Sequence, residues 1–330
     1  MYASRTLSNP QIPLTPADWP WAFWALTCVS FTVCIAAYFA IPPQLAQPVL
    51  GAGGRTPPFD YLGAANGVAG LLLVNFSLNQ APLAGWSTPY VYFSLAIGVL
   101  MLAYFALIEL RVAAPPLVPF RELQPQAAFV LAVIAAGWAS HGVWAYYLYL
   151  FLLRIRGATA VGAAAHTLPV VVSGPAFALS TGFLLRKMHV SVVMMLAMVA
   201  FLGGTALLAV APATQSYWGF TFVSVLVMPA GMNLSFPAGT IILSNLMPKS
   251  EQGKAASLVS TVVNYSIATG LGLAGSVERY ANDIGKSELE GYRWAWYLGM
   301  GLSGIGVLLS AYFFVLSRLE KKQREEREKV

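Results

Sequence analysis

The stretch Met228–Glu278, MPAGMNLSFPAGTIILSNLMPKSEQGKAASLVSTVVNYSIATGLGLAGSVE, joins two apolar runs through a short charged connector. Each run is long enough for a membrane-spanning helix, which needs about 20 apolar residues. The polar residues of each run recur at helical spacing, so they stack on one face of the expected helix. They are Asn233, Pro237, Thr240 and Ser244 in the first run, and Ser257, Thr261 and Asn264 in the second. The stretch therefore predicts two neighbouring membrane helices, each with a polar stripe.

The polar stripes have two interpretations. Two such stripes on adjacent helices can line a solute pathway. They can equally bond one helix to another, since Ser, Thr and Asn are common at membrane helix interfaces. Pro237 interrupts the first run and removes a backbone hydrogen bond, which predicts a helix kink at that position.

The composition of the whole chain extends this picture. Of the 330 residues, 58% are hydrophobic and 10% are charged, whereas soluble domains carry about 25% charged residues. The charge-free intervals 61–108 and 188–248 must each hold two spans divided by a turn. The net charge of +6 is scattered between the spans, which is typical of membrane loops and not of a nucleic-acid surface.

The cysteines and histidines indicate no metal site. Cys28 and Cys34 lie in one expected helix, about 9 Å of rise apart, too far to bond easily to each other. The sequence has no Cys/His cluster, so it predicts neither a metal nor a cofactor.

An all-α polytopic membrane protein of about nine spans is the expected fold class. The expected spans are residues 19–41, 61–79, 89–110, 126–153, 161–185, 190–211, 217–246, 255–278 and 293–316. A polar segment, 1–18, precedes them, a proline-rich linker occupies 111–125, and a charged tail, 317–330, follows.

The distribution of basic residues predicts the orientation. Cytosolic loops carry an excess of Lys and Arg, so the basic tail is expected inside and, with an odd number of spans, the amino terminus outside. The basic residues expected inside with the tail are Arg55, Arg111, Arg121, Arg186, Lys187, Lys249 and Lys254. Those expected outside are Arg5, Arg154, Arg156, Arg279, Lys286 and Arg293.

His141 is the only histidine deep within an expected span. An ionisable group in the membrane is a functional hypothesis by default, although a neutral histidine bonded to a neighbouring helix is the commoner case. Ser140, Trp144 and Tyr147 share one helix face, which suits a weakly polar or cationic ligand and suits ordinary packing equally. Glu109 and Glu278 fall at the ends of expected spans, so the sequence reveals no buried acid of the kind that proton coupling needs.

Four segments resemble a known family. They are FDYLGAANGVAGLLLVNFSLNQAPLAGW (59–86), GFLLRKM (182–188), MPAGMNLSFPAGTIILSN (228–245) and GKAASLVSTVVNYSIATGLGLAGSVE (253–278). Together they are similar to the fungal fourteen-span drug:proton antiporter group of the major facilitator superfamily. The likeness is greatest to its aminotriazole-resistance, boron-efflux and low-affinity ammonium transporters.

The resemblance implies a domain organisation. Members of that group have six amino-terminal spans, two linking spans and six carboxy-terminal spans, and the likeness begins at the sixth. It implies a remnant span of the amino-terminal bundle (19–41), two linking spans that pack peripherally (61–110) and a carboxy-terminal six-helix bundle (126–316). On this basis we expect an incomplete chain that lacks the first five spans.

The resemblance also marks a loop motif. Gly182, Arg186 and Lys187 match a degenerate copy of the family's cytoplasmic loop motif. Arg186 stands where an acidic residue often occurs, which puts the usual charge-relay role of the motif in doubt.

The resemblance implies secondary transport, of the efflux type, of a small polar solute or drug. The expected membrane is the plasma membrane or the vacuolar membrane, and protons are a candidate coupling ion. The expected pathway residues are His141, Trp144, Tyr147, Asn233, Thr240, Asn264 and Tyr265.

Two other classes of function remain open. The alternative is a non-transporting assembly partner or regulatory fragment that pairs with a full-length relative. An intramembrane enzyme built on His141 is disfavoured, because no second strong titrating group accompanies it, and we expect no enzymatic activity.

Overall fold

The computed structural model describes residues 19–40, 59–113, 116–118, 120–121, 124–247 and 252–327. Within these ranges all regular structure is helical, and nine helices are long and apolar enough to cross a membrane. The expected fold class is thereby confirmed, and the protein is an integral membrane protein. Parts of the sequence prediction lie outside the described residues, namely segment 1–18, Arg5, Arg55, Lys249 and residues 328–330 of the tail.

The first span forms a unit of its own. Helix α1 runs from Trp19 to Ala40 and belongs to a compact unit that ends at Phe59. Within this helix Cys28 and Cys34 carry free thiols. A single helix of this kind satisfies its backbone polar groups internally, as lipid requires.

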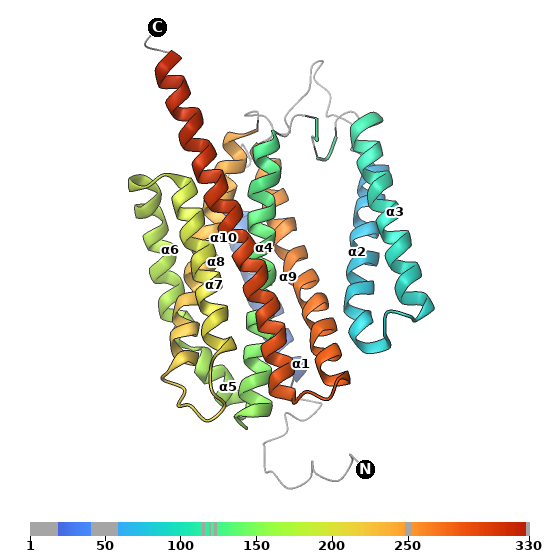
Figure 1. Cartoon of the computed structure of the whole chain (residues 1–330). Helices are drawn as coiled ribbons and strands as arrows, with labels where there is room; N and C mark the ends of the chain where they lie inside the picture. The colour runs from blue at the N-terminus through green and yellow to red at the C-terminus, as the bar shows by residue number, and fades with distance from the viewer. Residues whose placement is uncertain are drawn as a thin grey trace. The chain divides into compact units, whose positions relative to one another are not determined.

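Helices α2 (Tyr61–Ala84) and α3 (Pro89–Arg111) form an antiparallel hairpin (Figure 1). Glycines allow the two helices to approach closely, because a Cβ on Gly98 would lie only 2.9 Å from the backbone nitrogen of Val74. The Ser77 hydroxyl donates to the Val91 carbonyl oxygen at 2.7 Å. Close backbone approach and interhelical hydrogen bonds are the forces that associate helices in lipid.

Six spans follow the hairpin and pack as a bundle. They are α4 (Pro125–Leu150), which continues as the π-helical turn Phe151–Ile155, the pair α5 (Ala160–Thr167) and α6 (Pro169–Lys187), α7 (Val190–Ala209), α8 (Phe220–Asn245), α9 (Gln252–Asp283) and α10 (Glu288–Arg327). The expected single helix 161–185 is interrupted at Leu168, where Pro169 starts a new helix. Helix α10 continues through most of the expected tail.

Helix α4 occupies the centre of the bundle, against α7, α8, α9 and α10. Its tryptophans are tied to α8, since Trp138 Nε1 donates to Ser235 Oγ at 3.0 Å and Trp144 Nε1 donates to Ser224 Oγ at 2.7 Å. Buried polar groups that are bonded in this way do not incur the cost of desolvation without a partner.

Glycines of α9 let it pack closely on two sides. A Cβ on Gly270 would lie 2.6 Å from the carbonyl oxygen of Ala139 in α4, and one on Gly272 would lie 2.8 Å from the backbone of Leu78 in α2. Helix α2 therefore packs directly along α9. Small residues on α9 admit α2 closely, and the peripheral placement of the linking pair stays a prediction.

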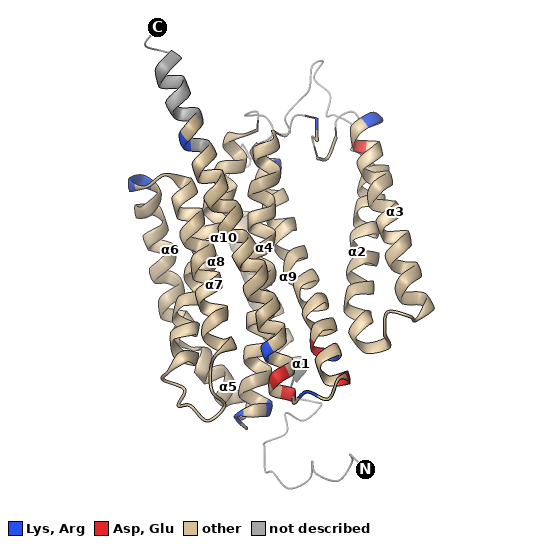
Figure 2. Cartoon of the chain, viewed as in Figure 1, with Lys and Arg blue, Asp and Glu red and all other residues tan. Residues whose placement is uncertain are grey.

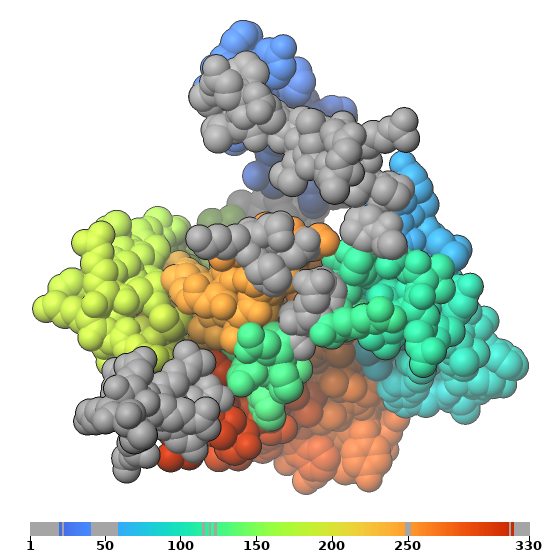
Figure 3. Space-filling view, turned by 90° about the horizontal axis from the view of Figure 1, so that it is seen from above, coloured from blue at the N-terminus to red at the C-terminus, as the bar shows by residue number. Residues whose placement is uncertain are grey.

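The charged residues mark the two ends of this unit. We call them the Glu288 end, where α4 stops and α10 starts, and the Lys254 end, where α9 starts. Lys, Arg, Asp and Glu gather at these ends, and the middle of each helix is free of them among the described residues (Figure 2). Seen from the Lys254 end, α6 and α3 lie on opposite sides of the bundle (Figure 3).

Candidate functional site

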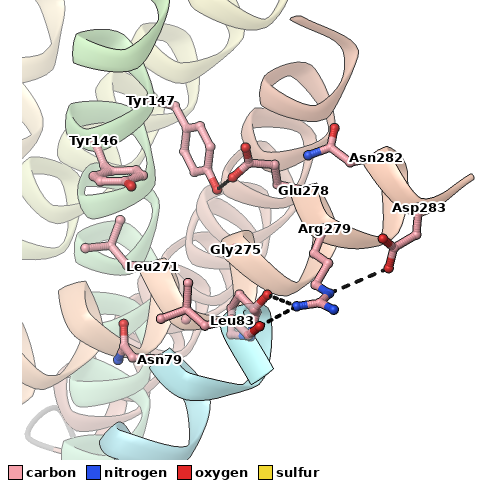
Figure 4. Close-up of a pocket in the computed structure, with 12 residues that line it drawn as sticks. Asn79, Leu83, Tyr146, Tyr147, Leu271, Gly275, Glu278, Arg279, Asn282 and Asp283 are labelled. Atoms are coloured by element: carbon pink, nitrogen blue, oxygen red, sulfur yellow. Dashed lines mark hydrogen bonds and ion pairs between the residues drawn. The ribbon is translucent and has the colours of Figure 1, made fainter. Parts of the chain in front are cut away.

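A cavity of about 550 Å³ opens at the Glu288 end between α2, α4 and α9. Its lining combines two carboxylates, amides, a guanidinium and aromatic rings (Figure 4). The lining residues are Asn79, Pro82, Leu83, Tyr146, Tyr147, Leu271, Gly272, Gly275, Glu278, Arg279, Asn282 and Asp283. The glycines follow from packing, since a side chain at Gly272 or Gly275 would collide with α2.

Glu278 is one of the two acids that line this cavity, the other being Asp283. Its Oε2 accepts a hydrogen bond of 2.7 Å from the hydroxyl of Tyr147, a residue that is only 1% exposed. Tyr147 in turn packs against Tyr292, with ring centroids 5.5 Å apart. The Tyr292 hydroxyl donates to Glu288, which also pairs with Arg154 at 3.1 Å. Tyr292 and its partners Glu288 and Arg154 thus hold in place the Tyr147 side chain, which in turn binds the Glu278 carboxylate.

Arg279 adjoins Glu278 in sequence but bonds elsewhere. Its Nη1 donates to the carbonyl oxygens of Pro82 and Leu83 at 2.6 and 2.7 Å, and its Nε lies 3.6 Å from Asp283. The last carbonyl groups of a helix lack partners within that helix, so Arg279 serves as a cap for α2. Figure 4 shows Arg279 directed toward Leu83, while Glu278 points toward Tyr147.

The chemistry of the cavity follows from this division of partners. The Glu278 carboxylate is held by a neutral phenol, and the amides of Asn79 and Asn282 and the ring of Tyr146 lie around the same space. A carboxylate forms its strongest hydrogen bonds with charged donors, and an aromatic ring attracts cations to its face. The arrangement can bind a small cation or a solute rich in hydrogen-bond donors.

A second cavity, of about 530 Å³, lies further along the same pair of helices. It is lined by Leu71, Leu72, Asn75, Ser260, Thr261, Asn264, Tyr265 and Ala268. It brings together the two expected pathway residues of α9, Asn264 and Tyr265, and adds Asn75 from the linking hairpin. Its lining holds amide and hydroxyl groups beside the apolar Leu71, Leu72 and Ala268, and it includes no charged residue.

The other two α4 residues of the expected pathway lie in an aromatic cluster. The half-buried ring of His141 stacks on Trp144, with centroids 5.8 Å apart, and meets Trp138 edge-on at 5.4 Å. Its Nδ1 is buried and has no hydrogen-bond partner within the described residues. Trp144 is 5% exposed and is bonded to α8, so it contributes to the packing of the bundle.

The expected pathway residues of α8 are satisfied locally. The Asn233 amide donates to the Pro229 carbonyl at 2.9 Å, and the Thr240 hydroxyl donates to the Phe236 carbonyl at 2.9 Å. Pro237 lies within the continuous helix α8, and the kink there stays a prediction. These residues line neither of the two cavities described above.

The loop motif lies at the end of α6. Arg186 and Lys187 form its last turn, and the Lys187 ammonium lies over the Phe183 ring at 4.4 Å. A side chain at Gly182 would meet no described atom within 4 Å. The motif is at the Lys254 end, away from Glu278 (Figure 2).

Sequence reasoning brought Tyr147 into the site but missed Glu278. The expected helix 255–278 ended at this residue, whereas α9 continues to Asp283. A usable signal was present downstream. Ser287 and Glu290 form a capping box, in which the Ser287 nitrogen donates to Glu290 at 3.0 Å, and this motif marks a helix start at Glu288. The start of α10 thus leaves room for a longer α9.

Comparisons with known proteins place these features in context. Residues 129–330 match the family model described as Major Facilitator Superfamily. The chain is 48% identical to the "Low affinity ammonium transporter" of Saccharomyces cerevisiae, over 93% of this chain and 60% of that protein.

Two further fungal relatives have names that refer to efflux or resistance. Identity is 42% to the "Efflux pump terJ" of Aspergillus terreus, over 90% of this chain and 57% of that protein. Identity is 35% to the "Aminotriazole resistance protein" of Saccharomyces cerevisiae, over 93% of this chain and 56% of that protein. Among solved structures, the nucleoside transporter NupG is 15% identical with a TM-score of 0.45, over 73% of this chain and 64% of that one. The chain thus spans less than two thirds of the length of these relatives.

Proposed function

Because this chain belongs to the Major Facilitator Superfamily, we propose that its six-span bundle, α4 to α10, forms one wall of a pathway that exports a small cationic or polar solute. The observation that carries this proposal is the cavity around Glu278. It holds a carboxylate that accepts a hydrogen bond from a buried tyrosine and lines a cavity with amide and aromatic groups at the end of the bundle.

The partners of the carboxylate favour a cation. Tyr147 supplies one hydrogen bond to Glu278, while Arg279 is directed to the end of α2. A cationic solute can therefore approach Glu278 without first breaking an ion pair to Arg279. The names of three relatives, which refer to ammonium, aminotriazole resistance and efflux, support solutes of this class.

A pathway of this type needs a second wall. Transporters of this superfamily move solute by rocking two bundles around a site at their interface, and this chain spans about 60% of the length of its relatives. We propose that a second bundle joins it to complete the path. By the positive-inside bias, the Lys254 end faces the cytosol and the Glu288 end faces outward, in a plasma membrane.

The test is solute flux in proteoliposomes. The chain is reconstituted alone and together with a full-length relative whose own transport has been disabled, and uptake of radiolabelled methylammonium is measured. Glu278→Gln removes the charge at nearly constant shape, and we expect it to lower flux by about tenfold or more, since a hydrogen bond to a charged group contributes about 1.5–3 kcal/mol. Glu290→Gln is the matched control, because that carboxylate is at the same end but outside the cavity. Equal flux in both variants would overturn the proposal.

A non-transporting assembly partner is the second candidate function. The six-span bundle by itself forms only one of the two walls that such a pathway needs. In that case the chain copurifies with a full-length relative and alters its stability or rate, but gives no flux of its own. Measurable flux from the chain alone would exclude this candidate.

A further inference from the structure

The α2–α3 hairpin holds two acidic residues at the Lys254 end, remote from the cavity of Glu278. Asp60 precedes α2 and caps it, since its Oδ1 accepts from the Gly63 nitrogen at 2.8 Å. Glu109 lies in the last turn of α3 and is only 4% exposed. An acid that is so deeply buried needs a partner or a proton.

The second oxygen of each carboxyl group lacks a partner. Asp60 Oδ2 and Glu109 Oε1 are both buried, and neither has a hydrogen-bond partner within the described residues. The two atoms also face the same point. A Cβ added to Gly63 would overlap Asp60 Oδ2 and would lie 3.2 Å from Glu109 Oε1. Glycine at this position leaves the space that both carboxyl oxygens border.

Three basic residues lie near Glu109. Lys254 of α9 approaches from one side, and its ammonium donates to the Pro116 carbonyl at 2.9 Å. Arg111 and Arg121 line a cavity of about 170 Å³ that also includes Glu109. These cations attract the acids as a group, yet the two unpartnered oxygens remain opposed to each other.

Two ionised carboxylates in one buried place repel each other, and one proton held between them removes the repulsion. The same proton makes a donor of one unpartnered oxygen and lets the other accept it, which satisfies both atoms. We propose that the buried carboxyl group of Glu109 retains a proton and that its Oε1 donates this proton to Asp60 Oδ2, which closes the Lys254 end of the α2–α3 hairpin through an O–H···O hydrogen bond.

The proton would also fix the segment that follows α3. The other oxygen of Glu109, Oε2, accepts from the Val118 nitrogen at 3.1 Å, and Lys254 holds the neighbouring Pro116. Glu109 can hold Val118 only while its carboxyl group stays in this buried position. The proton on Glu109 is thus a positioning element for residues 116–118, and it does not depend on the transport proposed above.

Carbodiimide labelling tests the proposal. Dicyclohexylcarbodiimide adds to protonated carboxyl groups in apolar surroundings, and peptide mass spectrometry locates the adduct. With the full chain in detergent near neutral pH, we expect an adduct on Glu109 and none on the exposed Glu290. Labelling should disappear as the pH is raised. No adduct on Glu109 would overturn the proposal.

Variants at Asp60 separate the hydrogen bond between the two acids from simple burial of Glu109. Asp60→Asn keeps an N-cap acceptor but removes the charge, so the pH of half-maximal Glu109 labelling should fall by about one unit or more. Asp60→Ser is a second variant with the same expected result, and size-exclusion profiles confirm folding. An unchanged midpoint in both variants would refute the hydrogen bond. Protection by sodium or potassium chloride, but not by choline chloride, would show that a metal cation occupies the place of the proton.

Discussion

Replacing Gly270 by alanine tests how closely α4 and α9 pack. The added Cβ would lie 2.6 Å from the carbonyl oxygen of Ala139 and 2.9 Å from its Cα. Both atoms belong to the backbone of α4, so a side-chain rotation cannot relieve the collision and the helices must move apart. Overpacking of this kind costs about 1–3 kcal/mol.

Gly301→Ala is the matched control. Gly301 lies inside α10, and a Cβ there meets no described atom within 4 Å. Both substitutions gain the same helix propensity, about 1 kcal/mol, which cancels in the comparison. We therefore expect the free energy of unfolding of G270A to be about 1–3 kcal/mol below that of G301A.

The measurement is a titration of the purified chain with sodium dodecyl sulfate in mixed micelles, followed by far-ultraviolet circular dichroism. Equal midpoints and slopes for G270A and G301A would refute the close approach of the two helices. A lower midpoint for G301A would show that the exposed face of α10 is packed in solution.

Two further predictions concern the cavity at the Glu288 end. Tyr147→Phe removes the hydrogen bond to Glu278 and should lower the free energy of unfolding by about 1.5–3 kcal/mol, measured by the same titration. Tyr146→Phe is the control, because it changes an exposed side chain and should leave the free energy of unfolding unchanged. Similar losses in both variants would contradict the hydrogen bond between Tyr147 and Glu278. Arg279→Gln removes the charged donor from the end of α2. The hydrogen bonds from this exposed guanidinium stabilise the end of α2 by about 1 kcal/mol. Hydrogen exchange in the last turn of α2 should therefore rise by about fivefold, with Lys286→Gln as the control that must not change it.

The spans were predictable because lipid constrains them strongly. The charge-free intervals 61–108 and 188–248 had to divide into helix pairs, and the described helices follow that division. The break at Leu168 was not expected, although Pro169 signals it, because proline is favoured in the first turn of a helix. Local signals of this type are weaker than the hydropathy that dominates a membrane sequence.

The sites were harder to predict because they depend on contacts between distant residues. From the sequence, Glu278 and Glu109 fall at the ends of expected spans, and nothing there indicates what covers them. Glu278 is held by a tyrosine 131 residues away, and Glu109 is covered by the chain beyond its own helix. Tyr147 was named because it shares a helix face with Ser140 and Trp144. Its partner was not, because helical spacing carries no information about which helices become neighbours.

The two basic side chains of α9 that hold the hairpin have a mechanical consequence. Lys254 bonds the chain after α3, and Arg279 bonds the end of α2. The two anchor points are about 38 Å apart along the axis of α9. Because α9 is bonded to the hairpin near both of its ends, it cannot rotate or slide without moving the hairpin as well. Any tilt of α9 would therefore be transmitted to the α2–α3 hairpin as a rigid lever.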